Sequence, residues 1–150
     1  MGFILNKPLI NVSLEAIWTN IGYEKKNPFF TNEDVCIGGP LASNAMFVIH
    51  SSEYFIDKKT IKVCEEISVT GTKEITDDIQ KGQGPRKAIF LLGYSGWTPG
   101  QLEDEIMRDS WFVSEKFQSL IFSVDYQTKW TDALLLLGID PSKLSSYAGS

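Results

Sequence analysis

Residues 88–103 read AIFLLGYSGWTPGQLE, an apolar run followed by glycines, aromatic residues and a helix-start pattern. The run 88–92 predicts a buried central strand that Gly93 ends. Thr98-Pro99 fits a helix cap and a first helical residue, with Gln101 placed to complete a capping box. The stretch therefore predicts a strand, a tight turn and a helix in direct succession.

Short strands and helices are expected on both sides of this stretch. Strands are predicted at residues 2–6, 35–37, 45–50, 54–56, 62–69, 111–113 and 120–124, with a hairpin joining 35–37 to 45–50 across Gly38-Gly39-Pro40. Helices are predicted at 13–20, from 72 to 82, from 98, from 128 to 138 with Trp130, Leu134 and Leu137 inward, and after Asp140-Pro141, with a loop at 23–34. Strands separated by both tight turns and helices indicate an α+β fold.

Length and composition limit the class of protein. The chain has 150 residues, 43% of them hydrophobic, which fits a single domain over residues 1–150. Its longest apolar run, 133–137, is far shorter than a membrane span, so a cytoplasmic protein without membrane contact is expected. A net charge of −5 opposes direct nucleic-acid binding, because that affinity comes mainly from Lys and Arg.

Two cysteines, Cys36 and Cys64, lie in apolar, β-branched surroundings without metal-binding spacing. They are predicted to be buried thiols in a reducing compartment. The sequence leaves a disulfide between them open.

The turn before the predicted helix is the candidate binding segment. Backbone N–H groups at such a position can hold a small ligand. The acidic residues 103–105 would repel a phosphate, so a neutral or amide-bearing ligand is the functional alternative to a self-capped structural connection. The candidate residues are Tyr94, Ser95, Gly96, Trp97, Thr98 and Gly100, together with His50.

Two nucleophile arrangements are also open to the sequence. Gly93–Trp97 partly matches the G-x-S-x-G nucleophile elbow, but a tryptophan replaces its last glycine, and His50 precedes Ser95 where that fold places histidine last. The predicted hairpin would allow Cys36 to approach His50. A single histidine at a strand end is more often structural, and no metal or cofactor motif is present, so no catalytic residue is assigned.

Several strings together resemble the bacterial YqgE/AlgH family across nearly the whole chain. The resemblance implies a compact cytosolic α+β domain with a strongly bent or barrel-like sheet and short flanking helices. Family members are often described as transcriptional regulators, without an agreed activity, cofactor or site. The strings are Leu5-Asn6-Lys7-Pro8, Gly38-Gly39-Pro40, Phe47-Val-Ile-His50, Phe90 to Glu103, Ser110-Trp-Phe112 and Leu136-Leu-Gly-Ile-Asp-Pro141.

Family members usually carry further residues before the string at 2–8, so this chain resembles an N-terminally shortened member. A sheet that lacks a neighbouring strand presents an unpaired edge. We therefore expect pairing with another copy of the chain or reduced stability.

The expected function is that of a non-catalytic binding or regulatory protein that acts on transcription through a protein partner. The motifs are glycine and aromatic turns rather than sets of acids, bases and metal ligands. The alternative is an enzyme or small-ligand-binding protein that uses residues 94–100.

Overall fold

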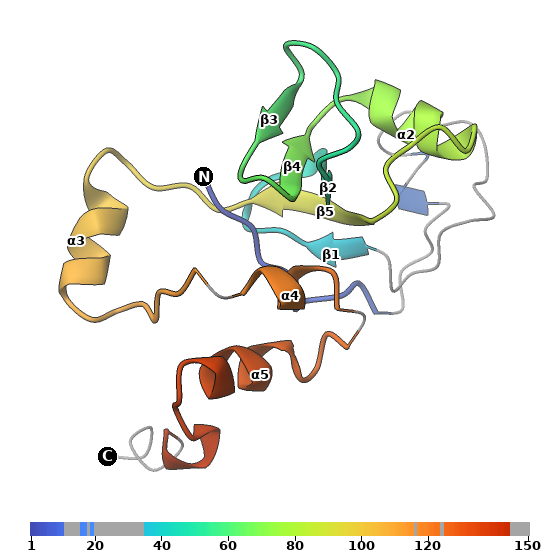
Figure 1. Cartoon of the computed structure of the whole chain (residues 1–150). Coiled ribbons are helices and arrows are strands. Elements are labelled where there is room, and N and C mark those ends of the chain that lie inside the picture. The colour runs from blue at the N-terminus through green and yellow to red at the C-terminus, as the bar shows by residue number, and fades with distance from the viewer. Residues whose placement is uncertain (11–15, 18, 20–34, 116, 124, 145–150) are drawn as a thin grey trace. The chain divides into compact units, whose positions relative to one another are not determined.

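The computed structural model describes residues 1–10, 16–17, 19, 35–115, 117–123 and 125–144. The chain divides into two compact units, Met1–Gly96 with the sheet and Trp97–Ser150 with the later helices. In chain order the elements in Figure 1 are β1 (Val35–Ile37), β2 (Leu41–Ser51), β3 (Thr60–Lys62), β4 (Ile67–Thr70), α2 (Lys73–Gln80), β5 (Ala88–Tyr94), α3 (Gln101–Met107), α4 (Gln118–Ile121) and α5 (Lys129–Leu136), followed by the 3-10 helix η2 (Pro141–Lys143).

The first unit is built on a five-stranded sheet with the strand order β1-β5-β2-β4-β3. β1 runs parallel to β5, and the other neighbouring pairs are antiparallel. The predicted α+β class, mixed sheet and short helices are confirmed. Within the described residues the sheet does not close into a barrel, although the register of β2 shifts between Leu41 and Met46, where an irregularity bends a strand.

β5 is an inner, buried strand of the sheet, as its apolar run predicts, with β1 on one side and β2 on the other. Phe90 has no exposed surface and pairs with Val35 on one side and Val48 on the other. Ile75 of α2 joins these three side chains in the main apolar core. The strand does not end at Gly93, because the positive φ of 72° at this glycine lets the chain continue to Tyr94.

The predicted hairpin between 35–37 and 45–50 is wrong, because β5 lies between β1 and β2 and pairs with both. Both strands themselves are confirmed. The glycines between the two strands do not form a hairpin turn; they allow the backbone to pack closely against the end of β5. A Cβ atom on Gly39 would lie only 2.1 Å from the carbonyl carbon of Tyr94.

The N-terminal segment covers the outer edge of β1 without forming the predicted strand at 2–6. It makes isolated bridges at Gly2 and Pro8. Its backbone nevertheless exchanges hydrogen bonds with β1, from Leu9 N–H to the Val35 carbonyl and from Ile37 N–H to the Lys7 carbonyl, both at 2.9 Å. Pro8 lies opposite Cys36 between these two hydrogen bonds, a position that needs no N–H group toward β1.

The region after β2 differs from its predicted strands. Residues 54–56 form no strand, and 62–69 is divided by a turn between β3 and β4. Val63 and Cys64 both donate their backbone N–H to the carbonyl of Ile67, which closes this turn. The exposed residues Glu65 and Glu66 lie in this turn. These two charged residues interrupt the apolar alternation from which a single strand over 62–69 is predicted.

Helix predictions are partly confirmed. α2 lies within the predicted span 72–82. α5 begins and ends close to its predicted limits, with Leu134 buried but Trp130 half exposed rather than inward. Asp140 caps η2 by accepting a hydrogen bond from Ser142 N–H at 3.0 Å, as predicted. At 13–20, residues 16, 17 and 19 are helical and the others lie outside the described residues, as does the whole predicted loop 23–34.

The strands predicted in the second unit are wrong. Residues 111–113 belong to no strand, and Leu120 lies in α4. Both segments are short apolar runs, a pattern that strands share with other structures and that periodicity alone cannot resolve.

Candidate functional site

The candidate segment 94–100 begins where β5 leaves the sheet. Tyr94 pairs with Leu41 of β2. Ser95 forms a two-way backbone bridge with Gly2, with its carbonyl accepting at 2.9 Å and its N–H donating at 2.8 Å. The backbone polar groups of Ser95 are therefore used by the fold of the first unit.

Gly96 is the last residue of the first unit, and Trp97 is the first of the second. Tyr94, Ser95 and Gly96 therefore belong to one unit together with His50, whereas Trp97, Thr98 and Gly100 belong to the other.

α3 begins at Gln101, two residues later than the start at Pro99 that its capping pattern predicts. Gly100 has a left-handed φ of 81°, which places Thr98-Pro99-Gly100 in a turn closed by Gln101 N–H and the Thr98 carbonyl at 3.0 Å. The predicted contact between Thr98 and Gln101 does form: the Gln101 side-chain oxygen accepts from the Thr98 N–H at 3.0 Å and from its hydroxyl at 3.2 Å.

A second polar cluster, which sequence reasoning missed, is centred on Glu105. One oxygen of its carboxylate accepts hydrogen bonds from the indole N–H groups of Trp97 at 3.2 Å and Trp111 at 2.7 Å. The other oxygen accepts from the side-chain amide of Gln101 at 2.9 Å. The bonds from Trp111 and Gln101, and then that from Trp97, hold the pKa of Glu105 below its ordinary value.

The two indoles of this cluster also touch each other. Their ring centroids are 5.9 Å apart, with the planes at 72°. This edge-to-face arrangement is a favourable one for aromatic rings. The sequence signals for the cluster were the four-residue spacing of Gln101 and Glu105 and the tryptophans on either side, neither of which is specific alone.

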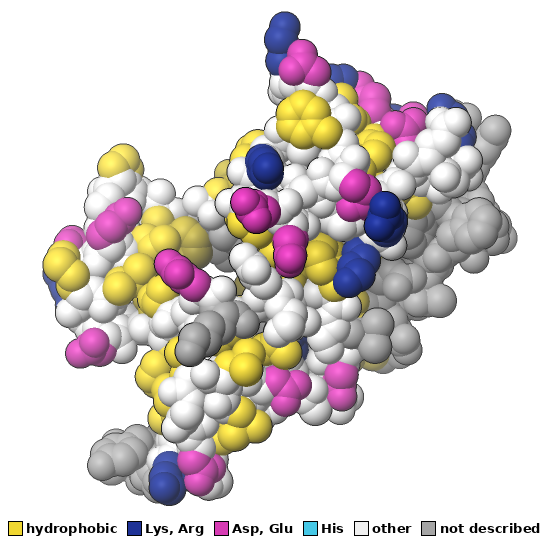
Figure 2. All heavy atoms as spheres, viewed as in Figure 1, with side chains coloured by type: hydrophobic (Ala, Val, Ile, Leu, Met, Phe, Trp, Pro, Cys, Tyr) yellow, Lys and Arg dark blue, Asp and Glu magenta, His cyan; other side chains and the backbone are white. Residues whose placement is uncertain are grey.

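An exposed apolar surface adjoins the cluster along the chain. Figure 2 shows hydrophobic side chains gathered around α3, and none of that helix's residues, all of which the structure describes, is buried. Five large apolar side chains between 106 and 113 are 38–74% exposed. We call these five the α3 apolar surface: Ile106, Met107, Trp111, Phe112 and Val113.

His50, the other candidate residue, is fully buried in β2 with both ring nitrogens engaged. Nδ1 lies 3.0 Å from the Ser51 carbonyl, which can only accept, so Nδ1 carries the proton. Nε2 then accepts from the Thr70 hydroxyl at 2.9 Å, and Thr70 accepts from the Thr60 hydroxyl at 2.7 Å. Burial is the main cause that lowers the pKa of His50, and the Ser51 bond and Glu53 oppose it. The ring thus lies in a buried hydrogen-bond chain that runs through Thr70 to Thr60.

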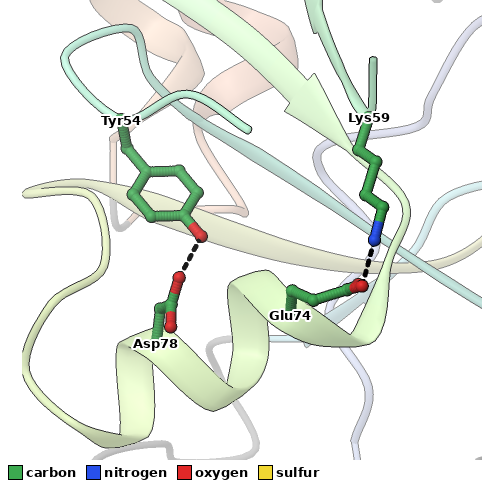
Figure 3. A network of polar contacts seen from close by, with 4 residues as sticks. All are labelled: Tyr54, Lys59, Glu74 and Asp78. Carbon is green, nitrogen blue, oxygen red and sulfur yellow. Dashed lines mark hydrogen bonds and ion pairs between the residues drawn. The ribbon is translucent and has the colours of Figure 1, made fainter. Parts of the chain in front are cut away.

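α2 is tied to the segment that follows β2, beside this histidine. The ring of Tyr54 meets that of His50 edge to face at 5.5 Å. Its hydroxyl donates to Asp78 of α2 at 2.7 Å, and Lys59 forms an ion pair with Glu74 of the same helix (Figure 3). Burial first, and then the Asp78 contact, raise the pKa of Tyr54. These bonds give His50 and Tyr54 structural partners.

The sheet register separates His50 from both predicted nucleophiles. Ala88 lies opposite His50, and Ser95 follows seven residues later, which is about 23 Å along an extended strand. Cys36 pairs with Leu91, one position along from the Val35–Phe90 pair, so its side chain lies on the other face of the sheet from His50. Neither a Ser95–His50 nor a Cys36–His50 pair is assembled.

The two cysteines differ in burial. Both are thiols; Cys36 is fully buried as predicted, whereas Cys64 is only half-buried, because it lies in the turn before β4.

The described part of the chain holds neither a metal-binding cluster nor a membrane-spanning helix. No cluster there contains the three His, Cys, Asp or Glu side chains that a metal ion would need. No helix in that part is long and apolar enough to cross a bilayer.

Comparison with known proteins shows the family of this chain. A family model described as AlgH-like matches residues 1–142. UPF0301 proteins of Cereibacter sphaeroides and Nitrobacter hamburgensis are 39% and 38% identical to this chain, covering 99% of it and 80% and 72% of their own lengths. The solution structure of the AlgH protein from Pseudomonas aeruginosa matches at a TM-score of 0.76 with 26% identity, over 100% of this chain and 78% of that one. The family suggested by the sequence strings is thereby confirmed: the chain belongs to the AlgH-like family.

Proposed function

We propose that the protein is a non-catalytic binding protein of the bacterial cytoplasm, which acts on transcription through contact with another protein. The observation that carries this proposal is the α3 apolar surface, which includes Trp111, one of the two indoles that the Glu105 carboxylate holds.

The residue types of this surface are those of protein interfaces. Trp, Phe and Met are enriched at the centres of interfaces, and Trp is over-represented among residues that dominate binding energy. Exposed groups of large apolar residues in soluble proteins mark sites of interaction. Fixing the indoles through Glu105 lowers the conformational entropy that binding would cost.

The placement of His50 supports a non-catalytic function. A general base needs a free nitrogen within reach of the proton that it removes. Both nitrogens of His50 already have partners inside the sheet, and its ring is fully buried. Ser95 lies at the far end of β5 from it.

The charge supports an effect on transcription through a protein partner rather than through DNA. The chain carries 19 acidic against 14 basic residues, so its overall field repels phosphate backbones.

Quantitative co-purification tests the proposal. The chain is tagged in its own bacterium and compared with a Trp111→Ala/Phe112→Ser variant and with a control variant, Glu65→Gln/Glu66→Gln, in the exposed β3–β4 turn. We expect the wild type and the control to retain one protein. The amount of that protein retained by the surface variant should be lower by about tenfold or more. Equal retention of every protein by all three would contradict the proposal.

A further inference from the structure

We propose that the segment bound by the α3 apolar surface is a basic stretch of a partner protein, with an arginine that stacks on Trp111 beside Glu105. This inference rests on the proposed function and specifies the chemistry of the partner.

The negative charge of the chain is concentrated in its second unit. Residues 1–96 contain ten Lys or Arg and eleven Asp or Glu, whereas residues 97–150 contain four and eight. The part that carries the α3 apolar surface is especially acidic: Glu103, Asp104, Glu105 and Asp109 lie there with Arg108 as the one basic residue between positions 97 and 113. Complementary charge at the rim of an interface speeds encounter and selects partners.

The Glu105 cluster suits a guanidinium group. The Trp111 side chain is 48% exposed, and its indole N–H is held by the carboxylate at 2.7 Å. A half-exposed indole therefore stands next to an anionic group. Arginine stacks on aromatic rings and pairs with carboxylates through its planar fork, whereas lysine offers a compact, strongly hydrated charge. A partner arginine would use both features, while apolar neighbours contact Phe112 and Val113.

Charge also argues against a second copy of this chain as the occupant. Two identical α3 surfaces would bring the acidic residues 103–105 and 109 of both copies together, and like charges that face each other across an interface oppose association. A basic segment of another protein meets the same surface without that penalty.

Titration with a synthetic peptide tests this chemistry on the full chain. The probe is a fluorescent 12-residue peptide with four arginines separated by leucine and serine, followed by anisotropy at low salt. Matched peptides replace every arginine by lysine or by glutamine. We expect the arginine peptide to bind about tenfold more tightly than the lysine peptide, and the glutamine peptide to bind more weakly than both.

Three variants locate the site. Two of them should each lower the affinity for the arginine peptide by about tenfold: Trp111→Ala and, separately, Asp104→Asn/Asp109→Asn. The second of these leaves every aromatic side chain in place. Glu65→Gln/Glu66→Gln, which removes two exposed acids of the first unit, should leave its affinity within about twofold.

Each outcome decides a different point. Equal binding of arginine and lysine peptides, or no loss with the acidic variant, would overturn the inference. Failure of all peptides, while the co-purified partner still depends on Trp111 and Phe112, would overturn the basic chemistry and leave the proposed function standing. A co-purified partner bound through an acidic or neutral segment, or a second copy of this chain, would also overturn it. Loss of both the peptide and the partner signals would remove both proposals.

Discussion

The indole rings of Trp97 and Trp111 meet edge to face, with their centroids 5.9 Å apart. The two residues are distant along the chain and are joined through a shared acceptor, because both N–H groups donate to the same oxygen of Glu105. A buried or half-buried indole N–H needs an acceptor, and one carboxylate serves two of them here. Through Glu105, α3 thus fixes the Trp97–Trp111 pair next to the exposed side chains of Phe112 and Val113.

Removing the shared acceptor should separate the two rings. In Glu105→Leu the side chain can no longer accept, so the near-ultraviolet circular dichroism that arises from fixed tryptophans should fall markedly. Glu103→Gln, two residues earlier in α3 and outside the cluster, is the matched control and should keep the signal. An unchanged spectrum in Glu105→Leu would show that the carboxylate does not hold the rings.

The buried histidine predicts a pH dependence of stability. Its folded-state pKa is lowered from 6.5, so the folded protein binds fewer protons than the unfolded chain. The stabilising contribution is fully present above the unfolded value and is lost as the pH falls from there toward the lowered folded pKa, by up to about 1.4 kcal/mol per pH unit. Urea unfolding between pH 7.5 and 5 should show this decline. His50→Gln should flatten it, and a wild type that is equally stable over that window would refute the assignment.

The close approach of β5 to the residues before β2 predicts a strong steric effect. In Gly39→Ala the new Cβ would meet backbone atoms of Tyr94 and Ser95 at 2.1–2.4 Å, and we expect a loss of about 3 kcal/mol or more in unfolding free energy. Gly82→Ala is the comparison, since Gly82 has a φ of 73° but open space around it, and should cost about 1 kcal/mol. Equal losses in both variants by denaturant unfolding would contradict the packing described.

The contacts of α2 in Figure 3 predict unequal effects on stability. Tyr54→Phe removes a donor from the half-buried Asp78 carboxylate, so unfolding free energy should fall by about 1–3 kcal/mol. Lys59→Gln breaks an ion pair between two well-exposed side chains and should have no measurable effect. The reverse order of the two variants in thermal and urea unfolding would disprove this ranking.

Sequence patterns predicted those elements whose signals are local. The apolar run before Gly93 predicted the buried inner strand β5, and Asp140-Pro141 predicted the capped η2, because a buried strand and an N-cap are fixed by a few adjacent residues. The hairpin failed for a different reason. Two glycines before β2 have the chemistry of a turn, and only the distant partner β5 reveals that they permit backbone contact instead.

The candidate site shows the same limit. The contact between Thr98 and Gln101 follows from a three-residue spacing and forms, although Gly100 delays the helix. The meeting of Trp97 and Trp111 on Glu105 depends on the path of the chain after α3, which no local pattern encodes. Ligand binding by residues 94–100 with His50 stays a prediction.

Photo-crosslinking in living cells tests the central claim, that this protein works through the α3 apolar surface, most directly. Benzoylphenylalanine is introduced in place of Phe112, or in place of the exposed Lys81 of the first unit as the control, and adducts are identified by mass spectrometry. The account predicts a recurrent adduct with one other protein from position 112, absent from position 81 and reduced when Trp111 is also changed to alanine. No adduct from position 112, or the same adducts from both positions, would contradict it.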